Sequence, residues 1–287
     1  MMRDYLCILA GGAIWGSIGI FVRLLAGSGL NSWEVVACRG VGATLIFALA
    51  MYLTDPKLFK IKPKDIWIFF AAGFVSHAGF NFCNFSCITL SSLAVAALLM
   101  YTAPIFVMLL SVLFLGEKLT PVKLIALVTT FIGCALITGV LEEEVKIDMA
   151  VLGFGIASGL GYALFSFFSK IALNRHYEAI TVTTYNFLFC ALAAIIMAGG
   201  VPFAKLDGQG WLGMLGISLL CSFGANLLYT IGLRNIEAGH ASILATIEPF
   251  MAAVIGFLLF GETLSTFKLI GMALILGAIL VLNLQEN

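Results

Sequence analysis

The sequence predicts an all-α integral membrane protein with ten transmembrane helices, arranged as two inverted five-helix repeats. Three observations predict this class: an apolar composition, ten apolar segments long enough to cross a bilayer, and self-similarity at half the chain length. Of the 287 residues, 62% are hydrophobic and 10% are charged, and the mean hydropathy is +1.11. Soluble domains contain about 45–50% apolar and about 25% charged residues. Lipid is therefore the main solvent of this fold.

Ten segments are expected to cross the bilayer. A helix needs about 20 apolar residues to span a hydrocarbon core of about 30 Å. Membrane strands would show about 9–11 residues of alternating polarity, whereas these segments are continuously apolar. In chain order, they are expected near residues 4–25, 31–54, 66–87, 91–115, 121–140, 149–172, 178–199, 210–233, 238–260 and 266–284.

The breaks between these segments contain charged residues, prolines and glycines, which end apolar helices. None of the breaks is long enough to hold a soluble domain. The first segment is expected to be retained rather than cleaved as a signal peptide, because its apolar run is long and an internal copy follows. In chain order, the breaks are Asp55-Pro56, Lys62-Pro63-Lys64, Gly116-Glu117-Lys118, Glu142-Glu143-Glu144, Pro202, Gly208-Gln209-Gly210 and Gly261-Glu262.

The basic residues predict the orientation. With the N-terminus inside, ten of the 15 Lys and Arg residues lie at cytoplasmic span ends, four lie at outer ends, and Arg39 lies within a span. Cytoplasmic loops carry an excess of Lys and Arg, so both termini are expected in the cytoplasm and the acidic run outside. Basic and acidic residues number 15 each, so no basic excess points to nucleic acid as a partner.

The two halves of the chain resemble each other. A shift of 145 residues places Gly116-Glu117 on Gly261-Glu262, and a shift of 147 places Trp15 on Tyr162. Each half holds five spans, an odd number, so the second half enters the membrane upside down. Inverted repeats are typical of secondary transporters, which expose a midplane site to each side in turn. The repeats are expected at residues 1–141 and 149–287, joined by a short acidic linker at 142–148.

Each repeat ends in an apolar stretch, a Gly-Glu pair and a final span: Pro104–Thr120 reads PIFVMLLSVLFLGEKLT, and Glu248–Ser265 reads EPFMAAVIGFLLFGETLS. With Trp15-Gly16 in the first span and Arg39 in the second, this pattern resembles the EamA family of the drug/metabolite transporter (DMT) superfamily over essentially the whole chain. The resemblance implies a carrier of the plasma (cell inner) membrane for small metabolites, often an exporter of amino acids or related compounds. It also implies a central cavity lined mainly by the first, third, fourth, sixth, eighth and ninth spans.

Two polar stripes are candidate substrate-binding surfaces. In the third span, His77, Asn81 and Asn84 follow spacings of four and three, which places them on one helical face. Polar side chains within a bilayer normally face a cavity or another helix. The alternative to cavity lining is ordinary hydrogen bonding between helices. The shift of 145 places the stripe on its counterpart in the eighth span, Ser222, Asn226 and Tyr229.

Aromatic residues extend the candidate site. Trp15 and Tyr162 lie about midway through the first and sixth spans, whereas interfacial belts place aromatic residues at span ends. Aromatic faces suit apolar or cationic ligands, although aromatic packing is also expected in a chain with 24 phenylalanines. Tyr101 and its repeat counterpart Thr246 complete the substrate-binding set.

Pro104 and Pro249 occupy matched places in the fourth and ninth spans. A proline within a helix removes one hydrogen bond and frees the carbonyl four residues earlier. In a bilayer such a carbonyl needs a new partner or a wet cavity. Two interpretations stay open at this point: a moving hinge and a static bend.

Arg39 and Glu248 are the ionisable residues expected near the midplane, roughly 12–15 Å deep at 1.5 Å per residue. A central charge is unfavourable by about 2.5–3.5 kcal/mol on insertion scales. They form an ion pair with each other, or Glu248 carries a proton or meets a cationic substrate. Their repeat counterparts are Asn186 and Ala103, so the symmetry requires neither charge.

Three other acidic residues lie nearer span ends. Glu34 is expected to reach water, and Glu117 and Glu262 are expected to fix helix ends. Two glycine pairs, Gly12 with Gly16 and Gly155 with Gly159, are expected to bring helices of the same chain together rather than to form a dimer.

No metal site or disulfide framework is expected from the seven cysteines, which all fall within predicted spans. Cys83 and Cys87 share a helical face, but this CxxxC spacing is not the two-residue spacing typical of metal ligands. The cysteines are therefore interpreted as small packing residues.

Enzyme, channel and ATP-driven classes are disfavoured. All aspartates lie in loops or at span ends, and the HExxH, GxSxG and GxxxxGK[ST] motifs do not occur. An inverted two-fold axis does not supply the rings of charge or carbonyls of a channel filter. No cofactor is expected.

The favoured function is a secondary transporter that moves a small amphipathic solute, such as an amino acid or amine, across the membrane. A lipid or lipid-carrier flippase of the same fold remains the alternative. The neutral and aromatic candidate set favours zwitterions or cations over phosphates. Coupling stays open between exchange and a proton carried by Glu248 or His77, and a monomer or weak homodimer is expected.

Overall fold

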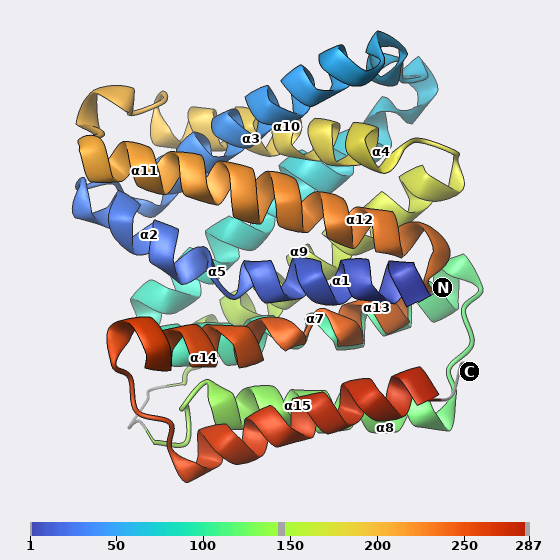
Figure 1. The fold of residues 1–287 in the computed structure, drawn as a ribbon, viewed down its shortest axis with the longest axis vertical. Coiled ribbons are helices and arrows are strands. Elements are labelled where there is room, and N and C mark those ends of the chain that lie inside the picture. The colour runs from blue at the N-terminus through green and yellow to red at the C-terminus, as the bar shows by residue number, and fades with distance from the viewer. Residues whose placement is uncertain (1, 143–146, 285–287) are drawn as a thin grey trace.

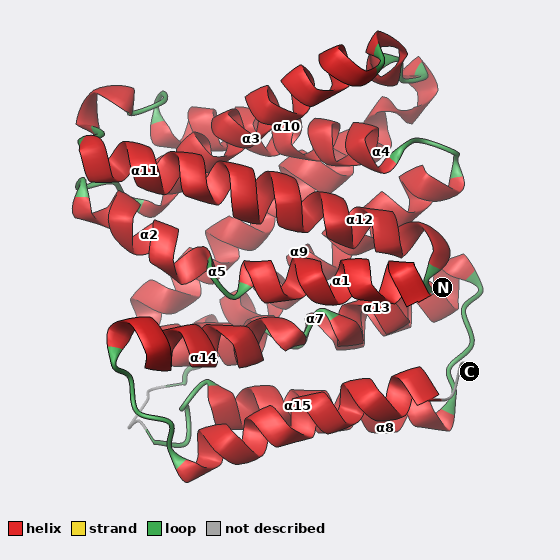
Figure 2. Cartoon of the chain, in the orientation of Figure 1, coloured by secondary structure: helices red, strands yellow, loops and turns green. Residues whose placement is uncertain are grey.

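The computed structural model describes residues 2–142 and 147–284, and every regular element in those residues is helical (Figures 1 and 2). The first half contains α1 (Met2–Trp15), α2 (Ile18–Gly27), α3 (Ser32–Thr54), α4 (Ile66–Phe70), α5 (Ala78–Leu90), α6 (Leu93–Met100), α7 (Ala103–Leu110) and α8 (Pro121–Ile137). The second half contains α9 (Met149–Asn174), α10 (Ala179–Ala198), α11 (Gly208–Gly216), α12 (Asn226–Asn235), α13 (Ala238–Leu244), α14 (Ile247–Phe260) and α15 (Thr266–Leu284). Most of the predicted acidic run, together with Lys146, lies outside the described residues.

The described chain contains nine helical segments long and apolar enough to cross a bilayer, and α8 is a shorter apolar helix of 17 residues. These ten segments follow the predicted spans in order, which confirms the all-α membrane fold. Three apolar spans contain π-helical stretches that the sequence analysis did not predict, at Ala71–His77, Ser111–Leu115 and Ile217–Ala225. Local π geometry often occurs at functional positions of helices.

Helices from the two halves pair with each other throughout the bundle. α3 packs along α10, and α8 packs along α15, at the two ends of the view in Figure 1. Between these pairs, α1 packs on α12 and α9 packs on α5. The first two contacts each join equivalent spans of the two halves. The other two are counterparts of each other, because α1 is equivalent to α9 and α12 is equivalent to α5. This is the pattern expected for an internal two-fold relation.

The bundle has two polar faces, one at each end of its helices. Asn235 Nδ2 donates to Asp4 Oδ1 at 3.0 Å, and Lys170 Nζ donates to the Leu233 carbonyl at 2.7 Å. The start of α1 and the ends of α9 and α12 therefore share a face, which we call the terminal face. The start of α1 and the end of α15 lie on the same side of Figure 1. Because α9 ends where α1 begins, the two equivalent spans run in opposite directions.

Glycines allow some of the closest helix contacts, and equivalent contacts occur in both halves of the chain. A Cβ at Gly16 would lie 2.7 Å from Met251 Cβ in α14, and a Cβ at Gly12 would lie 2.7 Å from Ile247 Cγ2. A Cβ at Gly155 would lie 2.6 Å from Leu99 Cβ in α6. The glycine pairs therefore pack against helices of the same chain, as predicted.

One expectation was wrong. Glu34 was expected to reach water, but its side chain is buried at the start of α3 and is only 6% exposed. Its carboxylate accepts hydrogen bonds from Lys205 Nζ at 2.7 Å and from the Asn31 N–H at 2.9 Å. The burial is tolerated because a buried charge can be stabilised by an ion pair and hydrogen bonds. The partner Lys205 lies too far along the sequence for local spacing to reveal it.

Candidate functional site

Three aromatic residues from different spans meet near the middle of the bundle. The ring centroid of Trp15 lies 5.1 Å from Tyr229 and 6.4 Å from Tyr162. Trp15 Nε1 donates to the Cys221 carbonyl at 3.1 Å, and the Tyr229 hydroxyl lies 2.7 Å from Ser166 Oγ. Tyr162 is half-buried, whereas Trp15 and Tyr229 are buried. The structure thus brings together three of the predicted residues from α1, α9 and α12.

The two predicted polar stripes are partly satisfied within their own helices. Asn81 Nδ2 donates to the His77 carbonyl at 2.7 Å, and Asn226 Nδ2 donates to the Cys221 carbonyl at 2.9 Å. Both asparagines are buried and follow the π-helical stretches, where the backbone ladder is altered. Asn84 is half-buried, and its Oδ1 atom is buried without a hydrogen-bond partner.

Arg39 connects the two stripes. Its Nε donates to Ser222 Oγ at 2.8 Å, and its guanidinium lies 5.8 Å from the centre of the Phe187 ring. His77 packs on the same Phe187 ring, with ring centroids 5.3 Å apart. The Nδ1 atom of His77 has no hydrogen-bond partner. Residues of α3, α10 and the third and eighth spans therefore converge on Phe187.

Glu248 is the acidic member of this group. Its carboxylate interacts electrostatically with Arg39 and with the hydroxyls of Tyr101 and Tyr162. Within the described residues, no ion pair joins it to Arg39, so the predicted direct pair does not form in this state. Both charged side chains are half-buried, although each lies within a membrane-spanning segment. Charged side chains within membrane-spanning segments almost always face the bundle interior or a water-filled cavity, and mark sites of function.

The matched prolines mark breaks in their spans. Pro104 lies in the first turn of α7, after a break at Tyr101-Thr102, and Pro249 lies in the first turn of α14. The Glu248 N–H donates to the Ala245 carbonyl at 3.0 Å, which accounts for one carbonyl that the ninth-span proline frees. The breaks place Tyr101 and Thr246 at equivalent positions. Thr246 is buried in the break between α13 and α14, and its hydroxyl donates to the Ile243 carbonyl of α13 at 2.6 Å.

The sequence analysis missed several members of this centre. Phe187 is the ring shared by Arg39 and His77, and Ser166 is the partner of Tyr229. Asn186 is buried, donates from Nδ2 to Ser169 Oγ at 3.0 Å, and leaves its Oδ1 atom without a partner. Its position as the repeat counterpart of Arg39 was the available signal.

The described residues contain no group of three or more His, Cys, Asp or Glu side chains that could hold a metal ion. The cysteines are free thiols, and five of them are buried. The observed contacts of Cys87 and Cys221 are hydrogen bonds to helix carbonyls of Val151 and Ile14. These contacts are consistent with the interpretation of the cysteines as small packing residues.

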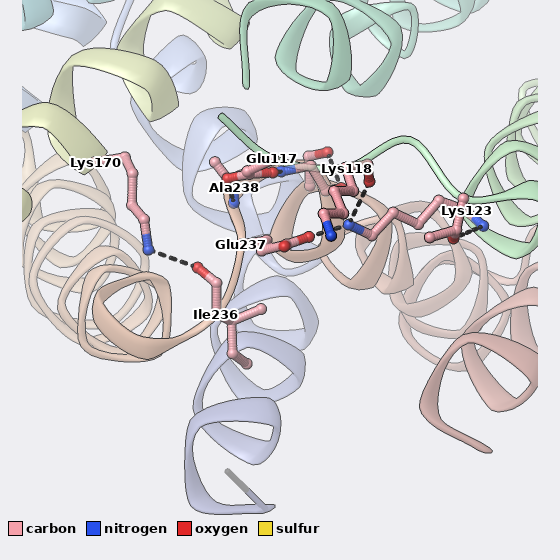
Figure 3. Close-up of polar contacts among 10 residues, drawn as sticks. Glu117, Lys118, Lys123, Lys170, Ile236, Glu237 and Ala238 are labelled. Carbon is pink, nitrogen blue, oxygen red and sulfur yellow. Dashed lines mark hydrogen bonds and ion pairs between the residues drawn. The ribbon is translucent and has the colours of Figure 1, made fainter. Parts of the chain in front are cut away.

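The terminal face holds a second polar network, between the halves (Figure 3). Glu117 and Lys123, from the loop after the fourth span and from α8, contact the segment that joins α12 to α13. Lys170 of α9 contacts the same segment through the Ile236 carbonyl at 2.8 Å. Glu117 was expected only to fix a helix end. It does so, but the helix is α13 of the second half.

A bundle of ten apolar helices, with polar and charged side chains gathered at mid-helix, defines a multi-pass membrane protein. The model of the EamA-like transporter family matches residues 2–139 and again residues 149–284. The chain belongs to this family, and each half contains one copy of its repeat.

Relatives agree with this assignment over nearly the full length. An uncharacterized transporter of Archaeoglobus fulgidus is 31% identical over 280 residues, which cover 96% of this chain and 94% of the relative. The uncharacterized transporter YxxF of Bacillus subtilis is 26% identical, with 91% and 83% covered. One crystal structure superposes with a TM-score of 0.85 at 17% identity, over 99% of this chain and 98% of its own. That likeness supports the fold.

Proposed function

We propose that the protein is a secondary transporter that moves a small amphipathic metabolite, such as an amino acid or an amine, across the cell membrane by alternating access. The two repeats would rock about a central site, with export as the direction and both termini in the cytoplasm. Family membership supports membrane transport in general. The substrate class is inferred from the side chains at the centre of the bundle.

The observation that carries the proposal is the arrangement of Arg39 and Glu248. They are opposite charges in membrane-spanning helices, both half-buried, within electrostatic range and not joined by an ion pair. A guanidinium suits a carboxylate, and a carboxylate suits an ammonium group. Trp15, Tyr162 and Phe187 add aromatic surface for an apolar or cationic part. A zwitterion with an apolar side chain matches this set.

The test is counterflow into sealed vesicles that contain the purified protein. A thermal-shift screen of amino acids, amines and small aromatic compounds selects ligands, and radiolabelled versions are then used for uptake. We expect Arg39→Gln and Glu248→Gln each to reduce counterflow at least tenfold. Glu142→Gln and Arg3→Gln make the same changes at exposed positions and serve as matched controls.

Two results would redirect the proposal. Counterflow that survives both central substitutions would show that these charges do not contact the substrate. Movement of a labelled lipid between leaflets, without solute uptake, would favour a flippase of the same fold. A pH gradient that drives uptake in the wild type and fails to do so in Glu248→Gln or His77→Ala would identify proton coupling.

A further inference from the structure

The Gly-Glu pairs that end the fourth and ninth spans have the same local geometry. Gly116 and Gly261 both adopt left-handed backbone conformations, with φ of 73° and 66°. The Glu117 N–H donates to the Ser111 carbonyl at 3.2 Å, and the Glu262 N–H donates to the Gly256 carbonyl at the same distance. Both bonds reach back six residues, one more than in the usual Schellman closure, so the two spans end in the same distinctive way. Any difference between the two carboxylates must therefore come from tertiary structure.

At the terminal face, the carboxylate of Glu117 joins the two repeats. It accepts hydrogen bonds from the backbone N–H groups of Ala238, at 2.5 Å, and Gly239, at 3.0 Å, the first residues of α13 (Figure 3). Burial raises the pKa of this carboxyl group above its ordinary value, although both N–H groups oppose the rise. Glu117 thus holds the start of the ninth span against the end of the fourth.

Lys170 secures the other side of the same connection. Its Nζ donates to the carbonyls of Leu233 at 2.7 Å, Ile236 at 2.8 Å and Arg234 at 3.3 Å. These three bonds use all the protons of the ammonium group, and Lys170 as a whole is only 9% exposed. Glu117 therefore binds the N–H groups of the first residues of α13, and Lys170 binds the backbone carbonyls of the residues just before them.

At the opposite face, the repeat counterparts make a different contact. Glu262 corresponds to Glu117, and Arg23 corresponds to Lys170. Arg23 forms an ion pair with Glu262 at 3.1 Å, and the two side chains are 57% and 43% exposed. In the described residues, Glu262 makes no hydrogen bond to α6, whose first residue Leu93 is 69% exposed. The same two-residue arrangement binds the facing segment at one face and does not bind it at the other.

We propose that Glu117 with Lys170, and Glu262 with Arg23, are two copies of a latch that close in alternation as the transporter changes the face to which it opens. This proposal rests on the alternating-access function proposed above. When the opposite face closes, Glu262 binds the N–H groups of Leu93 and Ala94. Arg23 then binds the carbonyls of Ile88, Thr89 and Ser91, and Glu117 turns to pair with Lys170.

The reason for the exchange is the inverted symmetry. The two end states of an inverted-repeat transporter are related by exchange of the conformations of its halves. Each interaction of one closed face then has a counterpart at the other face in the other state. Glu117 and Lys170 bind the same short stretch of chain, residues 233–239, so the released pair needs only a local rearrangement.

One ion pair of the terminal face has no equivalent ion pair at the opposite face. Lys123 forms an ion pair with Glu237, whereas the positions equivalent to these residues are Lys268 and Ser92. Ser92 Oγ instead accepts a hydrogen bond from the Val95 N–H at 3.2 Å, within its own turn. The closed terminal face therefore contains an ion pair that the equivalent positions of the opposite face cannot form.

The test measures distances across both faces by double electron–electron resonance in lipid nanodiscs, without substrate. Spin labels at Lys118 and Asn235 report the terminal latch, and labels at their repeat counterparts, Thr263 and Leu90, report the opposite one. These four side chains are exposed. The half-buried cysteines Cys7 and Cys83 are first replaced by serine, because they would take up label.

We expect opposite effects from the two equivalent substitutions. Glu117→Gln should shift the ratio of states about tenfold toward an open terminal face, lengthening the Lys118–Asn235 distance and shortening the Thr263–Leu90 distance. Glu262→Gln should deplete any minor population in which these distances are exchanged. Glu178→Gln removes an ion pair to Arg234 at the same terminal face but within one repeat, and should leave both distributions unchanged.

Unchanged distances in Glu117→Gln, or shifts in the same direction for Glu117→Gln and Glu262→Gln, would overturn the latch. If Glu117→Gln fails to fold, the exposed Glu262 variant and the wild-type populations still decide the question. The readout needs no substrate. Reciprocal distance changes without counterflow would therefore refute only the transport proposal, and counterflow with unchanged distances would refute only the latch.

Discussion

At the scale of single residues, the closest helix contacts depend on glycines, whose lack of a side chain lets two backbones approach. Gly16 lies at the turn between α1 and α2, where an added Cβ would lie 2.7 Å from Met251 Cβ and 2.9 Å from the Glu248 carbonyl oxygen. Two of the atoms near this position belong to the backbone of α14, which cannot move without displacing the ninth span. A side chain there would change the position of Glu248 as well as the packing.

We expect Gly16→Ala to reduce the free energy of unfolding by about 1–3 kcal/mol, as overpacking does. Thermal unfolding in detergent would show this as a lower Tm. Gly19→Ala is the matched control, because a Cβ at Gly19 meets nothing within 4 Å. In a helix interior, alanine is favoured over glycine by about 0.5–1 kcal/mol, so the control should be neutral or slightly stabilised. Equal effects of the two changes would contradict the close-contact argument.

The sequence identified many central residues but not their partners. Trp15 and Tyr162 were found because a repeat shift aligned two aromatic positions, and the structure places their rings 6.4 Å apart. Phe187 could not be singled out among 24 phenylalanines, since only tertiary packing places Arg39 and His77 on its ring. The binding roles of these residues remain predictions.

At the scale of elements, the prolines lie at matched breaks in the fourth and ninth spans. Proline fixes φ and lacks an N–H group, so the helix restarts at α7 and at α14 rather than continuing through the span. We expect these restarts to act as hinges. Their matched places in the two repeats would allow the same bend to change in either half.

Pro249→Ala should therefore slow counterflow severalfold while substrate affinity and Tm stay the same or rise, because alanine allows a more continuous helix. Pro104→Ala should have the same effect by symmetry. Pro202→Ala is the control, since Pro202 lies in the turn between α10 and α11. Unchanged counterflow in both span variants would show that the bends are static.

The start of α11 provides a prediction about pH. Asp207 accepts hydrogen bonds from Ser28 Oγ and from the Gly210 N–H, both at 2.7 Å. These bonds hold the pKa of the carboxyl group below its ordinary value of 3.8. A lowered pKa in the folded state means that the carboxylate stabilises the fold above the unfolded pKa. This stability is lost as the pH falls through the folded pKa.

We therefore expect Asp207→Ala to lower Tm at pH 7 and the difference from wild type to shrink as the pH falls below 4. Thermal unfolding between pH 7 and pH 3 would measure this. Gln209→Ala, two residues further on at an exposed position, should show no such trend. A difference in Tm that stays constant down to pH 3 would mean that the charge of Asp207 does not contribute.

The elements were largely predictable because apolar length determines a span. The breaks and π-helical stretches within the spans were harder to predict. Pro104 indicated a break near α7, but α1 stops at Trp15 without any proline nearby. The stretches at Ala71–His77 and Ile217–Ala225 contain no residue that requires π geometry. They arise where two repeats pack together, and single-span periodicity carries no information about that packing.

At the scale of the whole molecule, the distribution of basic residues predicts the orientation in the membrane. Ten of the 15 basic residues belong to the terminal face or its loops, which the positive-inside rule assigns to the cytoplasm. The terminal face is also where the halves are joined by Glu117, Lys123 and Lys170. In this orientation, the closed copy of the proposed latch faces the cytoplasm.

Cysteine labelling in intact cells tests this orientation. With Cys7 and Cys83 replaced by serine, a membrane-impermeant maleimide should label Gln209→Cys at the opposite face at once. It should label Lys57→Cys at the terminal face only after permeabilisation, and both positions are exposed. The reverse pattern would place the basic face outside and would turn the closed end of the bundle toward the exterior. The direction assigned to the proposed latch would then be reversed, while its alternation between faces, which depends only on the inverted repeat, would be unaffected.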